Sequence, residues 1–315
     1  MPATSAGMTA ESVLRGRMIR TVVGDIAACD GPALVHEHLR IDLTHRLAAI
    51  VIGAQDEADV VADLRQAAAA HGLRLVVDLS VIGSGRDALA LRRMSAESGV
   101  AVVCATGLYW DPLPEEAQHA SVEELCDAMV REIEAGVDGS GIRCGVIKIG
   151  TDAHPPTQAV ERLFRAAALA ALATGAPVIT HTTRADQAEW QMDILERSGL
   201  DLRHALISHF NSVDVARLEQ IARRNVFMGI DQIGFAKGPG YAALVDLVAG
   251  ACARGLAGQL ILSSDMARRT RLHRHGGTSY STVFTHFLPL LRERGVTAAQ
   301  IDTMLRDNPA RLLGL

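Results

Sequence analysis

Aromatic residues are scarce in this chain of 315 residues, which has only two Trp, three Tyr and six Phe. A hydrophobic content of 49% with 21% charged residues is typical of a globular protein, so its core must be built from Ala, Leu, Val and Ile. The five cysteines are scattered, and no Cys-x-x-Cys pair occurs. This pattern argues against a disulfide framework and a zinc–thiolate site, and it favours a reducing compartment.

The chain also lacks the features of nucleic-acid-binding and membrane proteins. Its formal net charge is −5, and no basic stripe with interleaved aromatic residues occurs. No segment approaches a membrane span, and Met1–Arg20 has no apolar run that would act as a secretion signal. We therefore expect a soluble, cytoplasmic protein that binds a small molecule, with residues 1–17 as a loose leader and 18–315 as a single domain.

Eight short apolar runs alternate with longer amphipathic or alanine-rich stretches such as Asp56–His71 and Thr157–Thr174. The predicted strands are Ala33–Val35, Leu73–Leu79, Ala101–Ala105, Val146–Ile149, Pro177–Thr180, Ala205–Ser208, Val226–Ile230 and Leu260–Ser263. Nearly all-apolar strands between helices are typical of parallel strands buried on both faces. Eight such units predict an α/β fold of the (β/α)8 TIM-barrel type rather than a doubly wound open sheet.

Polar residues stand at one end of these predicted strands. They are His36 and His38 after the first strand, Lys148 in the fourth, His181 and His209 at the ends of the fifth and sixth, and Asp265 after the eighth. The active site of such a barrel lies at the carboxyl ends of its strands, so these residues should converge. Imidazole and carboxylate ligands suit zinc, manganese, cobalt or iron. Asp231 ends the seventh strand at the same end and is expected to shape the pocket without binding metal.

Lys148 lies in the apolar run Gly145–Gly150, where desolvation should lower the pKa of its amine toward the neutral form. A neutral amine can react with carbon dioxide to give a carbamate, whose two oxygens can bridge two metal ions. A hydroxide shared by both metals would then be the nucleophile at neutral pH. Asp265 would bind one metal and accept the hydroxide proton.

Each of these residues has a simpler interpretation when it is taken alone. Lys148 could pair with a carboxylate, a histidine at a strand end could be a hydrogen-bonded core residue, and Asp265 could cap a helix. Their joint position at the correct ends of successive strands favours the two-metal interpretation.

Short motifs in order along nearly the whole chain resemble the phosphotriesterase family of the amidohydrolase superfamily. They are Val35–Leu39, Gly83–Asp87, Thr106–Tyr109, Val146–Gly150, Thr180–Thr182, Ser208–His209, Ser264–Asp265 and Asn308–Arg311. The resemblance implies that His36, His38 and Asp265 bind one metal, that His181 and His209 bind the other, and that carboxylated Lys148 bridges them. Zinc is the expected metal, and relatives of this kind are often homodimers.

Within the family, Asp265–Arg269 followed by His275–Gly277 and Tyr280 resembles the phosphotriesterase-homology branch more than the organophosphate-degrading enzymes. That branch and its neighbours include enzymes similar to lactonases, carboxylesterases and amide hydrolases. The resemblance therefore implies cleavage of a lactone, carboxylic ester or amide ahead of a phosphoester, with aryldialkylphosphatase activity as a side reaction.

The segment after the eighth strand, Asp265–Tyr280, is predicted to be a long functional loop. Its basic residues form either a solvated loop or an electrostatic funnel for an anionic substrate; they are Arg268, Arg269, Arg271, His273, Arg274 and His275. In relatives resembling phosphosugar lactonases, a Lys after strand seven and an Arg after strand eight hold an anionic group. Lys237 and Arg268 occupy comparable places, whereas Arg271 stands where a Tyr is expected.

Tyr109 and Trp110 follow the third strand and are expected to wall the leaving-group side of the pocket. Two alternatives to the two-metal hydrolase remain. One is a catalytically silent barrel that binds a ligand, although no ligand position of the pattern is missing. The other is a mononuclear deaminase on the same barrel, against which Lys148 counts.

Overall fold

The computed structural model describes residues 18–27, 29–109, 112–152, 155–182, 185–211, 213–235 and 238–314. The predicted leader, residues 1–17, lies outside the described residues, as do Trp110 and Lys237.

An eight-stranded sheet forms the centre of the fold, and each strand in it pairs in parallel with its neighbours. In spatial order the strands are β3 (Ala33–Glu37), β6 (Leu75–Asp78), β7 (Ala101–Leu108), β8 (Val146–Thr151), β9 (Val178–Thr182), β10 (Ala205–Ile207), β11 (Phe227–Ile230) and β12 (Leu260–Leu262). Spatial order follows chain order, as right-handed βαβ connections produce. The predicted TIM barrel is confirmed.

Hydrogen bonds beyond the regular ladders join the first strand to the segment after the last. The Asp265 N–H donates to the His36 carbonyl over 3.1 Å, and the His38 N–H donates to the Met266 carbonyl over 3.1 Å. The fully buried Glu37 carboxylate accepts from the backbone N–H groups of Ser264 (2.7 Å) and Met266 (2.8 Å). These bonds close the barrel at the place where the predicted metal ligands lie.

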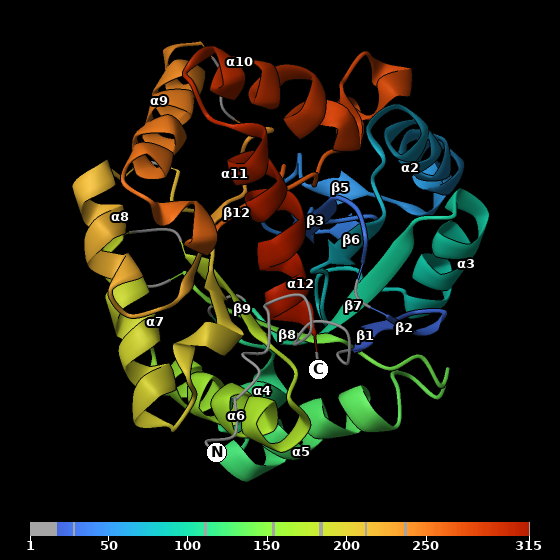
Figure 1. Cartoon of the computed structure of the whole chain (residues 1–315). Helices are drawn as coiled ribbons and strands as arrows, with labels where there is room; N and C mark the ends of the chain where they lie inside the picture. The colour runs from blue at the N-terminus through green and yellow to red at the C-terminus, as the bar shows by residue number, and fades with distance from the viewer. Residues whose placement is uncertain are drawn as a thin grey trace, which may run out of the picture.

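Helices pack on the barrel: most of them form an outer ring around the strands, and the last two lie across one end (Figure 1). They are α2 (Glu57–His71), α3 (Ala88–Ser98), α4 (Glu115–His119), α5 (Val122–Glu134), α6 (Gln158–Thr174), α7 (Ala185–Arg197), α8 (Val215–Ala222), α9 (Pro239–Ala253), α10 (Leu288–Glu293), α11 (Ala298–Asp302) and α12 (Asn308–Leu313). Polar N-caps begin several of them; for example, Ser121 and Glu124 form a capping box at α5. Glycines in the left-handed conformation end α2, α3 and α6.

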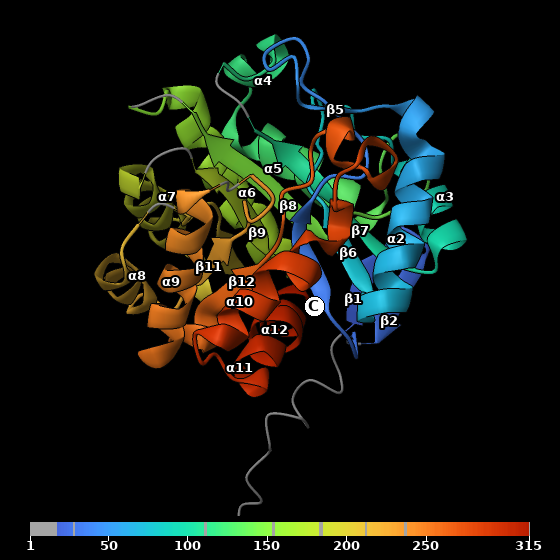
Figure 2. The same cartoon turned by 90° about the horizontal axis from the view of Figure 1, so that it is seen from above.

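Two short antiparallel pairs accompany the barrel: β1 (Met18–Thr21) with β2 (Gly24–Ala27), and β4 (Ile41–Asp42) with β5 (Val51–Ile52). From the side, β5 lies at one end of the barrel, and α11 and α12 lie at the other (Figure 2). The Asn308 side chain of α12 donates to the carbonyls of Ala257 and Leu260, so this helix covers the amino end of β12. The opposite end, at the carboxyl ends of the strands, carries the polar residues.

The segment predicted as a long loop after the eighth strand folds into short 3-10 turns, η4 (Arg269–Arg271), η5 (His273–His275) and η6 (Ser279–Ser281). It is followed by the π-helical turn η7 (Val283–Phe287). In the part of the chain that the structure describes, no helix has both the length and the hydrophobicity needed to cross a bilayer.

A buried ion pair ties the turn after β6 to the helical layer. The Arg86 guanidinium donates to both carboxylate oxygens of Glu132 on α5 over 2.6 and 2.7 Å, and to the Ala105 carbonyl over 3.2 Å. Thr106 on β7 donates to the same carboxylate over 2.6 Å. The Arg86 side chain is only 2% exposed, so its removal would leave a largely buried, uncompensated carboxylate.

We therefore predict that Arg86→Met lowers the free energy of unfolding by about 3 kcal/mol, the low end for breaking a buried pair. The matched control is Arg93→Met, which breaks the pair between Arg93, 53% exposed, and Glu57. This variant should lose at most about 1 kcal/mol, as exposed pairs do. Urea denaturation of both variants measures the difference, and equal losses would contradict this role for the Arg86–Glu132 pair.

Candidate metal centre

The barrel brings the six predicted ligands, which are far apart in sequence, to the carboxyl ends of its strands. They are His36 within β3, His38 just after it, Lys148 within β8, His181 within β9, His209 two residues after β10, and Asp265 three residues after β12. Several strands run past their predicted apolar ends; β3, for example, includes His36 and Glu37. The reason is that strands pair through their backbones, so polar residues can continue a strand. Glu37 of β3, for example, pairs with Asp78 of β6.

His36, His38 and Asp265 form one part of the cluster. The Nε2 atoms of His36 and His38 lie 3.9 and 3.5 Å from Asp265 Oδ1. All three side chains are buried, with 2%, 3% and 8% of each residue exposed. Two imidazole nitrogens and a carboxylate oxygen therefore face one small volume.

His181 and His209 form the other part. The distance from His209 Nε2 to His181 Nδ1 is 2.8 Å, and their ring centroids lie 4.6 Å apart. Asp231 on the opposite side accepts from the His209 backbone N–H over 3.0 Å and contacts His209 Nδ1 at 2.8 Å. Asp231 thus fixes His209 through both backbone and ring.

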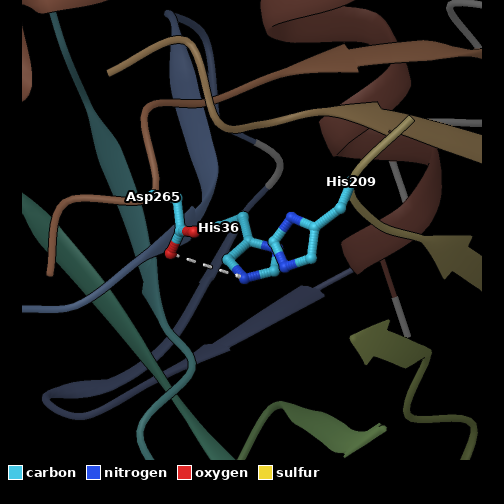
Figure 3. A group of neighbouring side chains, drawn as sticks. All are labelled: His36, His209 and Asp265. Carbon is cyan, nitrogen blue, oxygen red and sulfur yellow. Dashed lines mark ion pairs between the residues drawn. The ribbon is translucent and has the colours of Figure 1, made fainter. Parts of the chain in front are cut away.

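The two parts are continuous. Donor atoms of His36, His209 and Asp265 all lie within 4.8 Å of one another, close enough to hold one ion among them. The His36 and His209 rings lie next to each other with their centroids 4.8 Å apart, and the Asp265 carboxylate is directed at His36 (Figure 3). The resemblance assigns His36 to one metal and His209 to the other, and the structure brings both side chains into the same cluster.

Lys148 lies beside this cluster. Its Nζ is 3.4 Å from His36 Nε2, donates to the Thr180 carbonyl over 3.2 Å, and lies 5.4 Å from the centre of the Tyr109 ring. The residue is 1% exposed, and none of the described carboxylates forms an ion pair with it. Burial lowers the pKa of the amine to about 7, against the attraction of Asp265 and Asp231.

Hydroxyl and carboxylate groups hold the far side of three of the four imidazoles, those of His36, His38 and His209. Ser208 Oγ lies 2.9 Å from His36 Nδ1, and Ser80 Oγ lies 2.9 Å from His38 Nδ1. Asp231 holds His209 in the same way. With Nδ1 so engaged, His36, His38 and His209 present Nε2 to the cluster, an arrangement typical of metal-binding histidines.

The protonation states favoured by these surroundings also suit a cation site. Burial and the charge of Lys148 lower the pKa of His36 to about 4, so its ring is neutral at pH 7. Burial alone would raise the pKa of Asp265, but the hydrogen bond from His38 and the nearby histidines hold it below its usual value. A neutral imidazole, as in His36, and an ionised carboxylate, as in Asp265, are forms that bind divalent metals, so these residues fit the predicted metals.

The backbone is strained at two of the predicted ligands. His209 and Asp265 have φ angles of 71° and 51°, in the left-handed region that residues with a side chain rarely adopt. Such strain costs on the order of 1–3 kcal/mol per residue and tends to cluster at functional sites. Backbone hydrogen bonds to Asp231 and His36 hold the two residues in place.

A pocket of about 260 Å³ opens onto the cluster. One wall is apolar and comes from the β4–β5 segment; its residues are Ile41, Leu43, Leu47 and Ile50. Tyr109 lines the pocket, with the centre of its ring 5.0 Å from that of His181, and its place on the leaving-group side stays a prediction. Gln232, Phe235 and Arg268 line the remaining side.

The basic residues of the segment after β12 do not act together as one funnel. Three of them pair with carboxylates in or next to α2: Arg269 with Asp56, His273 with Asp63, and Arg274 with Asp59. Arg268 instead lines the pocket, and the guanidinium of Arg271 lies 5.4 Å from the centre of the Phe235 ring. The loop interpretation therefore holds for the paired residues. Among the described basic residues of this segment, Arg268 lines the pocket, whereas Arg271 lies against Phe235, which lines it.

Sequence reasoning did not identify Ser80, Ser208, Gln232 or Glu37 as parts of the site. Ser208 precedes His209 in one of the family motifs, and Glu37 stands between two predicted ligands, so their positions were visible in the sequence but their partners were not. Asp231 was expected to shape the pocket without binding metal, and it lies behind His36 and His209.

The fold is a TIM barrel, and the buried histidine–carboxylate cluster at the carboxyl ends of its strands is a candidate metal centre. The phosphotriesterase family profile matches residues 17–313, and the chain belongs to this family. The prediction made from the motifs is confirmed.

The relatives extend over most of the chain. A protein of Escherichia coli K12 named phosphotriesterase homology protein is 33% identical over 293 residues, which cover 89% of this chain and 97% of that protein. Human N-acetyltaurine hydrolase is 30% identical and covers 78% of this chain and 74% of its own. A mutant of a PTE-like lactonase from Deinococcus radiodurans superposes with a TM-score of 0.82 at 30% identity, covering 94% and 100% of the two chains. These relatives support a hydrolase of the phosphotriesterase family.

We predict that Asp231→Asn lowers divalent-metal affinity by about 10- to 100-fold, as losses of the group behind a ligating histidine do. The amide keeps the shape but removes the charge that holds His36 and His209. Competition with a chelator measures the affinity. Asp193→Asn, at an exposed pair with Arg224, is the matched control and should bind metal like the wild type.

Proposed function

We propose that this protein is a binuclear metal-dependent hydrolase that cleaves a lactone, a carboxylic ester or an amide. Family membership supports the hydrolase class, and the buried cluster supports the metal dependence. His36, His38 and Asp265 would hold one divalent ion, and His181 and His209 the other. Zinc is the metal we propose first, with manganese, cobalt and iron as ions that the same ligands suit.

One observation carries this proposal: Lys148 is buried beside the histidines and has no carboxylate partner among the described residues. A structural lysine in such a place would be expected to pair with a carboxylate. With a pKa of about 7, a large fraction of the amine is neutral at physiological pH. Its lone pair can attack the carbon of carbon dioxide, and loss of one proton leaves an anionic carbamate with two oxygens.

Bound divalent ions would supply a Lewis acid for the substrate oxygen and would lower the pKa of a water molecule. The chain's own residues prepare the site for this chemistry. Ser80, Ser208 and Asp231 orient the imidazoles, and Gln232 Nε2 donates to Asp265 Oδ2 over 3.3 Å. Asp265, held ionised by its surroundings, is the proposed acceptor of the proton that the attacking water loses.

The pocket supports an acyl substrate. Its wall at Ile41, Leu43 and Ile50 is apolar, and Leu47, which also lines it, is 47% exposed, so an apolar portion of a substrate could cover that side chain. Phosphoester cleavage, including aryldialkylphosphatase activity, would use the same metals as a side reaction, because both reactions develop negative charge on an oxygen. In this proposal, the leaving group lies toward Tyr109.

The proposal extends to the protein's setting. We propose a cytoplasmic enzyme that acts on a small molecule as a homodimer and binds neither nucleic acid nor membranes. The free thiols of all five cysteines support a cytoplasmic location. The net charge of −5 supports the proposal that the protein does not bind nucleic acid. The dimer rests on the resemblance alone, and light scattering of the purified chain measures it.

We predict that Lys148→Ala abolishes binding of at least one of two zinc ions, because the variant loses the bridging anion. Elemental analysis after zinc loading measures the metal content. Native mass spectrometry of the wild type in bicarbonate should show the added mass of one carbon dioxide, absent from the variant. In metal-free protein this adduct should decline as the pH falls below about 7, where the amine becomes protonated.

Lys148→Glu is the companion variant, because it supplies a carboxylate without carbon dioxide. Its metal content should exceed that of Lys148→Ala and should not depend on bicarbonate. Full metal content in Lys148→Ala would contradict the bridging role, whatever its activity.

We also predict that the zinc-loaded protein hydrolyses γ-lactones, aryl esters or N-acyl amides with a higher kcat/KM than paraoxon. Manganese- and cobalt-loaded protein, assayed in parallel, would show whether the ranking depends on the metal. Strong paraoxon turnover with inert lactones, esters and amides would reverse the proposed order of substrates.

A further inference from the structure

A buried glutamine of the helical layer contacts the two strands that carry Lys148 and His181. Gln191 on α7 is 0% exposed. Its Nε2 donates to the His181 carbonyl and to Thr151 Oγ1, both over 2.8 Å, and its Oε1 accepts from the Thr182 hydroxyl over 3.0 Å. The amide thus joins α7 to the carboxyl ends of β8 and β9.

Packing alone does not require an amide at this position. Ala188 and Leu195, three and four residues from Gln191 on the same face of α7, are apolar and 0% exposed. Removing an amide from water is unfavourable unless its hydrogen bonds are replaced, and here both N–H groups and the oxygen are used. A fully satisfied buried network specifies one arrangement of the groups that it joins. Gln191 therefore selects one placement of the two strand ends.

His181 is the predicted ligand on which such a hold acts most directly. Its Nδ1 lies 2.8 Å from His209 Nε2, whereas His36, His38 and His209 present Nε2 to the cluster. Because Nδ1 is bonded to Cγ, it lies closer to the backbone than Nε2 and follows a movement of the main chain more closely. Serine or aspartate side chains hold the other three rings at Nδ1, the atom that His181 turns to the cluster itself.

The neighbouring strand also approaches His181 closely. Gly150 of β8 pairs with His181 in the parallel ladder, and a methyl group at Gly150 would lie 2.8 Å from His181 Cβ, too close for two carbon atoms. The main chain of His181 is thus confined by Gly150 within the sheet and by Gln191 in the helical layer.

We propose that Gln191 is a positioning residue of the candidate metal centre. From the helical layer it fixes the main chain of His181 and thereby the place of the nitrogen that faces His209. The inference rests on the proposed function, in which His181 and His209 hold the second divalent ion. Gln191 is not among the described residues that line the pocket, so it acts through His181 and not on the substrate.

Gln191→Met tests this role, because it keeps an unbranched side chain of similar length but removes all three hydrogen bonds. In chelator competition with zinc-loaded protein, the affinity for one of the two ions should fall by about 10- to 100-fold, as it does when groups that orient a ligand are lost. The other ion should bind as in the wild type. Wild-type affinity for both ions would overturn the role of Gln191.

Gln259→Met is the matched control. Gln259 also donates to two main-chain carbonyls, those of Ala222 and Val226 over 2.8 and 3.2 Å, but at the amino ends of β11 and β12. The variant removes the same kind of bond without touching the metal centre, so both zinc affinities should be unchanged. Equal falls in Gln191→Met and Gln259→Met would reveal a general loss of stability and would contradict the positioning of His181.

Thr182→Val is a milder variant that keeps the test open if Gln191→Met does not fold. It removes the hydroxyl that orients the amide, so the same ion should bind more weakly, by a smaller factor. In the double variant with Gln191→Met, the two losses should be less than additive in free energy, because both act through one amide. Unchanged zinc affinity in Thr182→Val, or additive losses in the double variant, would contradict the proposal.

A crystal structure without metal separates failure of the positioning role from failure of the proposed function. In metal-free Gln191→Met, the distance from His181 Nδ1 to His209 Nε2 should exceed the 2.8 Å of the wild type. If the wild type binds no zinc but this displacement occurs, the hydrolase proposal fails and the positioning role stands. If the wild type binds two zinc ions and Gln191→Met shows neither the displacement nor the weaker binding, the positioning role fails and the hydrolase stands.

Discussion

The buried carboxylate of Glu37 holds together the two segments that close the barrel and carry three of the predicted ligands. It accepts hydrogen bonds from the backbone of Ser264 and Met266, on both sides of Asp265, while His36 and His38 flank it in sequence. Burial raises the pKa of this carboxyl to about 8, and the hydrogen bonds from Ser264 and Met266 oppose that shift. Fold closure and ligand placement thus depend on one carboxylate, which links the stability of the seam to the geometry of the site.

A second buried carboxylate completes this part of the structure. Asp78 at the end of β6 accepts from the backbone N–H groups of Leu39 and Ser80 over 2.5 and 2.9 Å, and Ser80 in turn holds His38. The loop that carries His38 is therefore fixed by β6 on one side and, through the bond from the His38 N–H to the Met266 carbonyl, by the segment after β12 on the other. Side chains that never face the pocket restrict the histidines to the orientation that a metal centre needs, which is how a rigid barrel supports a precise site.

The pocket has two chemically different sides. The β4–β5 segment offers an apolar wall, whereas Phe235 and Arg268 border the side nearest the unpaired Arg271. The same metal ligands would serve the cleavage of any acyl bond, whichever substrate carries it. The preference for one substrate over another would therefore come from the walls of the pocket. The same barrel can then serve lactones, esters or amides through changes in its loops.

The eight-stranded barrel, and the end at which its polar residues gather, could be predicted from local patterns alone, because each apolar run ends at or next to one of the polar residues along the chain. Family membership also followed from its motifs. The groups that stand behind the ligands became visible in the folded chain, since Ser80, Asp231 and Glu37 reach their partners across 42, 22 and 227 positions of the sequence. It also separated Arg271 from Arg274, which are equivalent as charges in the sequence. The physical reason is that hydrogen bonds and ion pairs depend on directions in space that local patterns do not encode.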